Sequence, residues 1–243
     1  MKLNQFIDDA LGPILENREV SVDNVIEALE NCMNNVISGS IRKNIKVVLT
    51  ENDIKIYMEN GHQPIRFDPN RISSDLVNKV REHLPFFINR IEDDSRYNYW
   101  KPFRHKIREG YIIRVPKEKD RVDVSLGNNH VGSMPHHFFA KHEKYAQGQS
   151  MMFYVAKVKR PCQVILSRNS IMLPIAYLED RMPLVNNNSF SCAYRIVGKC
   201  EIYSKVYIPQ QIIDDLSREL RELVIVKIVP SLPVPGLSRS LSR

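Results

Sequence analysis

Five short strand patterns follow one another between residues 106 and 168, beginning with Gly110-Tyr-Ile-Ile-Arg-Val115 and ending with Val164-Ile-Leu-Ser-Arg168. Short apolar or alternating runs bounded by turn residues predict strands. The predicted strands cover 110–115, 122–126, 131–134, 149–158 and 162–167, with a loop or short helix at 136–145. Five strands with one irregular segment after the third are typical of an OB fold, a small β-barrel that binds single-stranded nucleic acid on one face. An SH3-like barrel is the alternative architecture.

The positive charge of the chain is concentrated in this same segment. Residues 101–168 hold 14 Lys and Arg against 5 Asp and Glu, a net charge of +9. Residues 1–100 carry a net charge of −4 and residues 169–243 carry +2, which gives +7 for all 243 residues. A concentrated positive field favours a polyanionic partner, because each neutralised phosphate releases counterions. The segment 101–170 is therefore the predicted RNA-binding domain, whereas the acidic residues 1–100 argue against nucleic acid as their own partner.

The predicted RNA-binding face mixes cationic side chains with rings. Bases stack on rings, and cations follow the phosphate backbone. The candidate residues are Lys106, Arg108, Tyr111, Arg114, Arg121, His130, His137 and Arg168. Phe138 and Phe139 lie in the same segment, and because they are adjacent in sequence only one of them is expected to face outward.

The geometry of the first predicted strand decides whether Tyr111 and Arg114 can face the same way. Side chains alternate between the two faces of a strand, so Tyr111 shares a face with Ile113, and Arg114 shares the other with Ile112. Tyr111 and Arg114 share a face only if the strand contains a bulge, and Gly110 favours such an irregularity. With a bulge, Tyr111 is a stacking platform beside Arg114; without one, Tyr111 is a core residue.

Residues 1–100 are predicted to form an α+β domain. Helical spacing of apolar residues predicts helices at 1–15, where Pro13 is expected to end the helix, and at 22–37, the second capped by Ser21 and followed by Gly39. Strands are predicted at 45–50 and 54–58, with a short third strand near 65–67. A further helix starts at 73–75, and Pro85 is expected to break or kink it. Residues 90–103 look like a connector, and its aromatic residues are interpreted as packing between domains.

The residues after the barrel predict a second small α+β unit. The pattern is a helix at 171–178, strands at 190–197 and 200–206, a helix at 209–222 and a strand at 223–229. Residues 230–243 are rich in Pro, Ser and Arg, which is typical of a disordered tail.

Several classes of chemistry find little support in the sequence. His130, His136, His137 and His142 match no zinc-ligand spacing, and the four cysteines form no CxxC pair. Phosphate-binding loops and hydrolase motifs are missing from a chain with only 9 glycines, and the adjacent carboxylate pairs, such as Asp214 and Asp215, are typical of solvated surfaces. We expect no enzymatic activity, cofactor, metal or small-molecule substrate; a nuclease that uses His136, His137 or His142 is the enzymatic alternative.

Hydropathy favours a protein that neither crosses a membrane nor is secreted. Mean hydropathy is −0.32, and no apolar run approaches the ~20 residues of a membrane span. The N-terminal residues carry Asp8 and Asp9 and have no apolar region of the signal-peptide type. We expect a cytoplasmic protein with reduced cysteines.

The barrel segment resembles the S-one-type OB domain of ribosomal and transcription proteins. The resemblance rests on Gly110-Tyr-Ile-Ile-Arg-Val115, Val122-Asp-Val-Ser-Leu-Gly-Asn-Asn129, Tyr145-Ala-Gln-Gly148 and the closing Ile165-Leu-Ser-Arg168. The order of parts over about 185 residues is similar to the NusA family of bacterial transcription factors. In particular, Val25-Ile-Glu-Ala-Leu-Glu30 precedes a hairpin, a long helix leads into the barrel, and an apolar helix ends at Arg181-Met-Pro-Leu-Val185.

The C-terminal part departs from that family, whose members continue with two KH domains. Here residues 171–229 resemble one reduced KH-like unit, and Tyr207-Ile-Pro-Gln-Gln211 stands where the family has its GxxG loop. Proline and glutamine do not allow the close backbone approach that glycine allows. RNA clamping of the KH type is therefore not expected, and this end is interpreted as structural or protein-binding.

The resemblance implies a transcription elongation factor. Residues 1–100 would dock on RNA polymerase near the RNA exit channel, and the barrel would hold single-stranded nascent RNA, with effects on pausing, termination or antitermination. Such a factor would act in a bacterial cell or, if virus-encoded, in the host cytoplasm. A ribosome- or exosome-associated RNA adaptor with the same barrel is the alternative.

Overall fold

The computed structural model describes residues 21–41, 45–50, 53–58, 74–116, 120–186 and 188–232. It is an α+β structure with a closed five-stranded barrel and a second small sheet, which agrees with the coarse fold class predicted. The chain divides into two compact units, Met1–Arg96 and Tyr97–Arg243. The predicted helix at 1–15, the third strand near 65–67 and most of the tail at 230–243 lie outside the described residues. Among the helices described, none combines the length and the apolar character that crossing a membrane requires.

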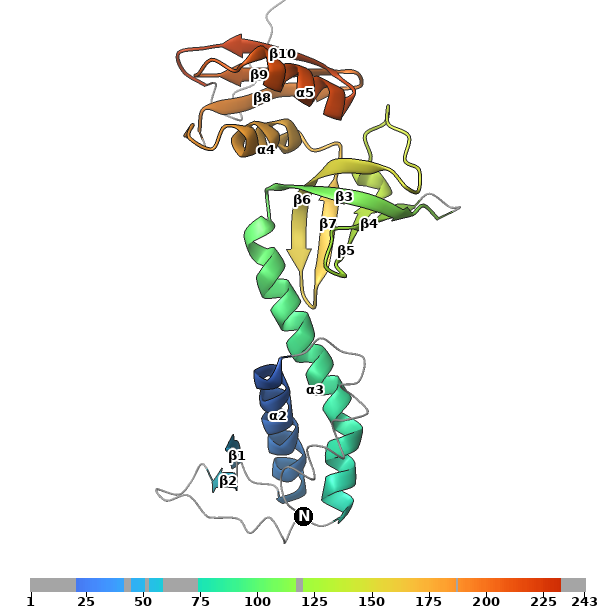
Figure 1. Ribbon diagram of the computed structural model, residues 1–243, viewed down its shortest axis with the longest axis vertical. Coiled ribbons are helices and arrows are strands. Elements are labelled where there is room, and N and C mark those ends of the chain that lie inside the picture. Colours follow the sequence, from blue (N-terminus) through green and yellow to red (C-terminus); the bar gives the residue numbers. More distant parts are fainter. Residues whose placement is uncertain are drawn as a thin grey trace, which may run out of the picture. The chain divides into compact units, whose positions relative to one another are not determined.

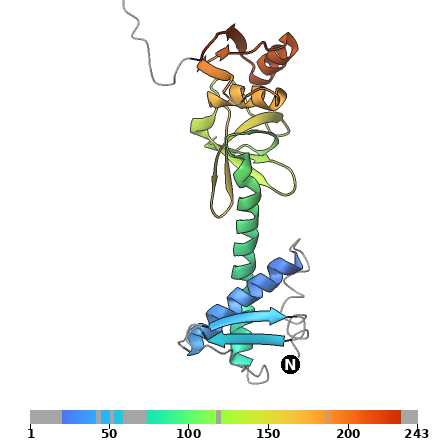
Figure 2. The ribbon, with the colours of Figure 1, turned by 90° about the vertical axis from the view of Figure 1, so that its left-hand side faces the viewer.

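The first unit packs a β-hairpin and a long helix against a shorter helix. It contains α2 (Val22–Ile41), β1 (Ile45–Thr50), β2 (Asp53–Met58) and most of α3 (Ser74–Trp100), and Figure 2 shows the hairpin beside α2. Ser21 caps α2, as predicted, because its Oγ accepts a hydrogen bond of 3.3 Å from the Asn24 N–H. The Glu30 carboxylate on α2 accepts the Leu49 N–H of β1 at 2.7 Å, so helix and hairpin share hydrogen bonds as well as a core.

Helix α3 continues through Pro85 instead of ending there. The expected break is therefore not observed. Leu84 and Ile88, on either side of the proline, are buried in the core of the first unit, and this packing offsets the backbone hydrogen bond that proline removes.

The barrel occupies the N-terminal half of the second unit (Figure 1). Its strands are β3 (Ile107–Arg114), β4 (Arg121–Ser125), β5 (Val131–Pro135), β6 (Ser150–Lys159) and β7 (Gln163–Ser167), with short 3-10 helices η2 (Lys101–Phe103) and η3 (His136–Phe138). The five strand predictions are confirmed to within a few residues. The strand order is β3-β4-β5-β7-β6, closed by β6 pairing with β3, and only β5 and β7 run parallel.

Two glycines let this small barrel close. A Cβ at Gly110 would overlap the Val124 side chain, and one at Gly132 would lie 2.8 Å from Leu166 Cδ1. The interior is filled by fully buried side chains: Ile112, Val122, Val124, Met134, Phe153, Val155 and Leu166. Trp100 joins the same core from the end of α3 and is 3% exposed.

Two helices and a three-stranded sheet complete the second unit. The elements are α4 (Met172–Arg181), β8 (Phe190–Ile196), β9 (Lys199–Ser204), α5 (Gln210–Leu220) and β10 (Leu223–Ile228), as predicted apart from a few terminal residues. The sheet order is β10-β9-β8, with β9 and β10 parallel. Leu173 and Ile175 of α4 share one core with Ile107 and Tyr154 of the barrel and with buried residues of this sheet, so barrel and sheet are packed through α4 (Figure 1).

Candidate nucleic-acid interface

Tyr111 and Arg114 lie on the same outer face of the barrel, because β3 contains the bulge on which the sequence reasoning depended. Tyr111 is opposite Ser125 and Arg114 is opposite Asp123, with the register shift between Ile112 and Arg114. Ser125 and Asp123 are two residues apart on β4 and therefore share a face. Tyr111 is 49% exposed and Arg114 is exposed, whereas Ile112 is fully buried. Tyr111 is therefore a surface residue and is available for stacking.

The outer face continues across β4 and β5. Ser125 pairs with Val131, Asp123 with Ser133 and Arg121 with Pro135. Ser125 is the small side chain between Tyr111 and Val131, which is 54% exposed, and Ser133 lies on the same face beside Asp123; we call these residues of β3, β4 and β5 the strip. An exposed ring beside a small side chain leaves room for an unstacked base.

Arg121 stands at one end of this face and already has a partner. Its Nε lies 3.4 Å from Asp123 Oδ1, and half of the Arg121 side chain is exposed. The Asp123 side chain is 18% exposed, so this pair is partly buried. We therefore expect Arg121 to reach a phosphate with the exposed part of its side chain while Asp123 stays beside it.

His130 and Arg108 belong to an aromatic cluster at the end of α3. The His130 ring stacks on Tyr99 with centroids 5.3 Å apart and planes 8° apart, and the Arg108 guanidinium lies 3.8 Å from the Phe103 ring centre. Tyr99 is 51% exposed. The connector aromatics thus pack on the barrel, and Tyr99 offers a second exposed ring that the sequence analysis did not include among the RNA contacts.

Lys106 and His137 are exposed but lie off the strip. Lys106 precedes β3, at the end opposite Arg114, and His137 lies in η3 with its ring 4.2 Å from that of Phe138. Phe138 and Phe139 are both half-buried against the barrel core, so neither is the outward-facing ring that was expected.

The structure corrects the assignment of Arg168. This side chain is fully buried, and all five of its N–H donors have acceptors within the protein. Nε donates to both Glu143 oxygens, at 3.1 and 2.9 Å, and Nη1 donates to Glu219 Oε1 at 2.8 Å and to the Met152 carbonyl. Nη2 donates to Glu143 Oε1 and to the Glu219 carbonyl. Arg168 is therefore a structural ion-pair residue with no donor left for a phosphate.

Electrostatics keep this buried group charged. Burial alone would lower the pKa of Arg168, but the hydrogen bonds and charges of Glu143 and Glu219 raise it. Burial, followed by the Glu143 charge, also raises the pKa of Tyr145, whose hydroxyl donates to Glu143 Oε2 at 2.8 Å.

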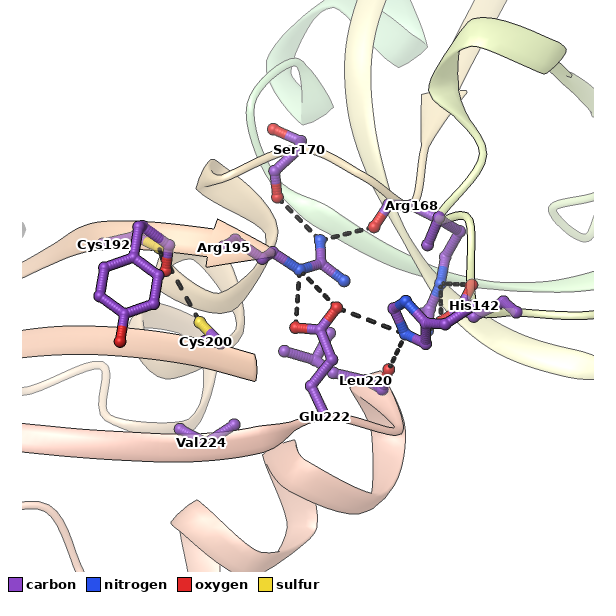
Figure 3. A network of polar contacts seen from close by, with 12 residues as sticks. His142, Arg168, Ser170, Cys192, Arg195, Cys200, Leu220, Glu222 and Val224 are labelled. Carbon is purple, nitrogen blue, oxygen red and sulfur yellow. Dashed lines mark hydrogen bonds and ion pairs between the residues drawn. The ribbon is translucent and has the colours of Figure 1, made fainter. Parts of the chain in front are cut away.

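A second buried arginine, Arg195, lies beside the first (Figure 3). Its Nε donates to both Glu222 oxygens at 3.0 and 2.9 Å, and its Nη1 donates to the carbonyls of Arg168 and Ser170. His142 Nε2 lies 3.0 Å from the Leu220 carbonyl oxygen and 3.4 Å from Glu222 Oε1. The two arginines thus tie the barrel to β8 and to the turn between α5 and β10.

The histidine side chains of the central segment do not lie together at one site. His136 and His137 are exposed in η3, whereas His142 belongs to the Glu222 network. Within the ranges that the structure describes, no three His, Cys, Asp or Glu side chains are grouped so as to hold a metal ion.

Comparison of the sequence with protein-family models and with curated proteins finds no match. The function proposed below is therefore supported by the geometry of the barrel face, the charge distribution and the sequence resemblance described above.

Proposed function

We propose that this chain is a NusA-like transcription elongation factor that holds single-stranded nascent RNA on the outer face of β3, β4 and β5. The observation that carries the RNA-binding part is the β3 bulge, which brings an exposed ring, Tyr111, and an exposed cation, Arg114, onto one open face. Bases stack on such rings, and cations neutralise the phosphates beside them.

The strand order supports an OB fold for the barrel. Numbered within the barrel, its strands follow the order 1-2-3-5-4, and the fourth strand closes on the first. OB folds bind oligonucleotides across their second and third strands and the adjacent loops. Those strands are β4 and β5 here, and they carry Arg121, Ser125, Val131 and Ser133 of the strip.

The proposed RNA path follows from these positions. One base would stack on Tyr111 above the small Ser125, and successive phosphates on one side of that base would lie beside Arg114 and then Arg121. One base–ring stack contributes about 1–3 kcal/mol. A face that neutralises ~4 phosphates of a single strand would give a slope of log affinity against log salt near −3.

The polymerase-docking role of residues 1–100 is supported by the family resemblance and by their net charge of −4. A net negative charge disfavours RNA, so we propose a protein partner for this part. The C-terminal helix–strand–strand–helix–strand order is consistent with a reduced KH-like unit, for which we propose a structural or protein-binding role. Pausing, termination or antitermination would be the process affected.

Two measurements test the proposal. Fluorescence anisotropy of the full chain with a labelled single-stranded RNA should show an affinity loss of about 3- to 10-fold for Arg114→Ala, as expected for one lost phosphate contact. Lys205→Ala, an exposed cation outside the barrel, is the matched control and should leave the affinity unchanged. Equal affinity of the Arg114 variant and the parent chain, with folding intact, would show that the RNA-binding face is elsewhere.

The second measurement concerns the partner. Affinity purification from the native cell should recover RNA polymerase. Recovery of ribosomes or an exosome instead would support the alternative, an RNA adaptor that uses the same barrel face.

A further inference from the structure

Two cysteine side chains lie against each other between β8 and β9 (Figure 3). The Sγ atoms of Cys192 and Cys200 are 3.8 Å apart and share a hydrogen bond, and both thiols are free. Cys200 is fully buried, whereas Cys192 is half-buried. The second unit thus holds two thiols in contact, of which one is accessible from outside and the other lies behind it.

A bulge in β8 shapes this pair. Cys192 is opposite Ile202, and the register of β8 shifts directly after it, between Cys192 and Tyr194. Cys200 lies two positions from Ile202 on β9 and shares its face, so Cys192 is the diagonal neighbour of Cys200. A bulge bends its strand and increases the local twist. Because β8 is a terminal strand of the described sheet β10-β9-β8, it can adjust at the bulge more easily than an inner strand.

The two thiols differ in acidity as well as in exposure. The hydrogen bond with Cys200 lowers the pKa of Cys192 although burial opposes it, and the positive charge of Arg195 lowers it further. The same hydrogen bond raises the pKa of Cys200, and burial adds to that effect. The thiolate is the reactive form of cysteine. Cys192 is therefore suited to attack a reagent from solution, and Cys200 to react second.

We propose that Cys192 and Cys200 form a thiol–disulfide exchange site that takes low-molecular-weight disulfides, such as oxidised glutathione, as its substrates. The Cys192 thiolate attacks one sulfur of the small disulfide, forms a mixed disulfide with it and releases the other half as a thiolate. Cys200 then loses its proton, attacks Cys192 Sγ and displaces the second small thiolate. The protons of the two cysteines end on the two small thiols, and two electrons pass from the protein to the small disulfide. The site would operate whether or not the barrel binds RNA.

The geometry makes this exchange reversible. A disulfide bond is about 2.05 Å long, so the two sulfur atoms, now 3.8 Å apart, must approach by about 1.8 Å. Rotation of the Cys192 side chain and adjustment of β8 at its bulge can supply this movement. A bridge that draws its strands away from their relaxed positions is more easily reduced. An excess of a small thiol should therefore restore the reduced pair.

The test treats the full chain with an excess of oxidised over reduced glutathione, followed by blocking of free thiols and digestion with trypsin. Arg195 and Lys199 lie between the two cysteines, so trypsin places Cys192 and Cys200 on separate peptides unless a disulfide joins them. Mass spectrometry should find these two peptides linked, and dithiothreitol should separate them. Cys200→Ala removes the second sulfur, so glutathione should stay attached to Cys192. Cys162→Ala, the control at the other half-buried cysteine, should leave the bridge unchanged.

The parent chain alone decides the proposal, even where a variant at the buried Cys200 fails to fold. Emission of the buried Trp100 verifies that the second unit is folded during the reaction. Absence of the linked peptides from the folded parent chain would overturn the proposal. Glutathione that remains on Cys192 of the parent chain would overturn it as well, because Cys200 would then not complete the exchange. A bridge that links Cys192 to Cys32 or Cys162 in preference to Cys200 would also contradict it.

Discussion

Replacing Glu143 by glutamine removes the charge that balances the buried Arg168 guanidinium. Both side chains are completely buried, and Glu143 accepts from Nε and Nη2 of Arg168. Removing one partner of a buried ion pair costs about 3–5 kcal/mol of stability, because the remaining charge is left uncompensated.

Two features of the site reduce that loss. Glu219 remains 2.8 Å from Nη1, although its side chain is 25% exposed and so balances the charge less well. Glutamine also keeps one oxygen that can accept a hydrogen bond. We therefore expect Glu143→Gln to lower the free energy of unfolding by about 2–3 kcal/mol, and Glu219→Gln by about 1 kcal/mol. Asp215→Asn, which breaks an exposed ion pair with Arg218, is the control. It should change the free energy of unfolding by less than about 0.5 kcal/mol.

Urea unfolding followed by tryptophan fluorescence measures these differences. Trp100 is the only tryptophan in the chain and is 3% exposed in the barrel core, so its emission reports on the second unit. RNA affinity of the folded Glu143 variant should equal that of the parent chain, because Arg168 does not reach the surface. A loss below about 1 kcal/mol, or equal losses for Glu143→Gln and Glu219→Gln, would refute the assignment of Glu143 as the principal counter-charge.

Three further predictions address other parts of the chain. Tyr111→Ala should lower RNA affinity by about 1–3 kcal/mol, measured by anisotropy, with little change in Tm because the ring is half-exposed; a large drop in Tm with unchanged affinity would place the ring in the core. Deleting residues 1–95 should abolish polymerase co-purification but leave RNA affinity within a few-fold, since the barrel belongs to the unit Tyr97–Arg243; polymerase binding by the truncated chain would contradict this. When the folded chain is treated with iodoacetamide at about pH 8, Cys192 should be modified before Cys32, as measured by mass spectrometry. A hydrogen bond with Cys200 lowers the pKa of Cys192, whereas burial raises the pKa of Cys32 to about 11; faster labelling of Cys32 would show that its site opens.

The strands of the barrel could be predicted from the sequence because each one carries its own local signals. Apolar and polar residues alternate in 121–125, and Val122 and Val124 are buried while their neighbours are not. This alternation predicts both the strand and the face that points inward. Turn residues such as Gly127 and Asn128, both at positive φ, mark where a strand ends. The N-cap of α2 could be predicted for the same reason, because Ser21 directly precedes the helix that it caps.

The role of Arg168 could not be predicted in this way, because its partners are distant in sequence. Glu143 lies 25 residues before it and Glu219 lies 51 residues after it. Within a block of net charge +9, another arginine at the end of a strand is most simply assigned to the nucleic-acid surface. Only the packing of α5 against the barrel shows that it is buried. Helix α3 is a similar case, since burial of Leu84 and Ile88 overrides the helix-breaking tendency of Pro85.

The same contacts make the barrel and the C-terminal sheet one structural body. Glu219 of α5 accepts hydrogen bonds from the Arg168 guanidinium and from the Met152 N–H of β6. Arg195 of β8 donates a hydrogen bond to the Arg168 carbonyl. Ile107 and Tyr154 of the barrel are buried in the core that contains α4 and α5. A chain that ended near residue 170 would leave Arg168 without one of its two carboxylates and would expose that core to water, at a cost of about 25 cal/mol for each Å² of apolar surface. The face of β3, β4 and β5 that we propose to bind RNA therefore depends on Glu219, which lies 51 positions after Arg168. The C-terminal unit of α4, β8, β9, α5 and β10 therefore has a structural role of its own, because its side chains complete the ion pairs and the core on which the barrel rests.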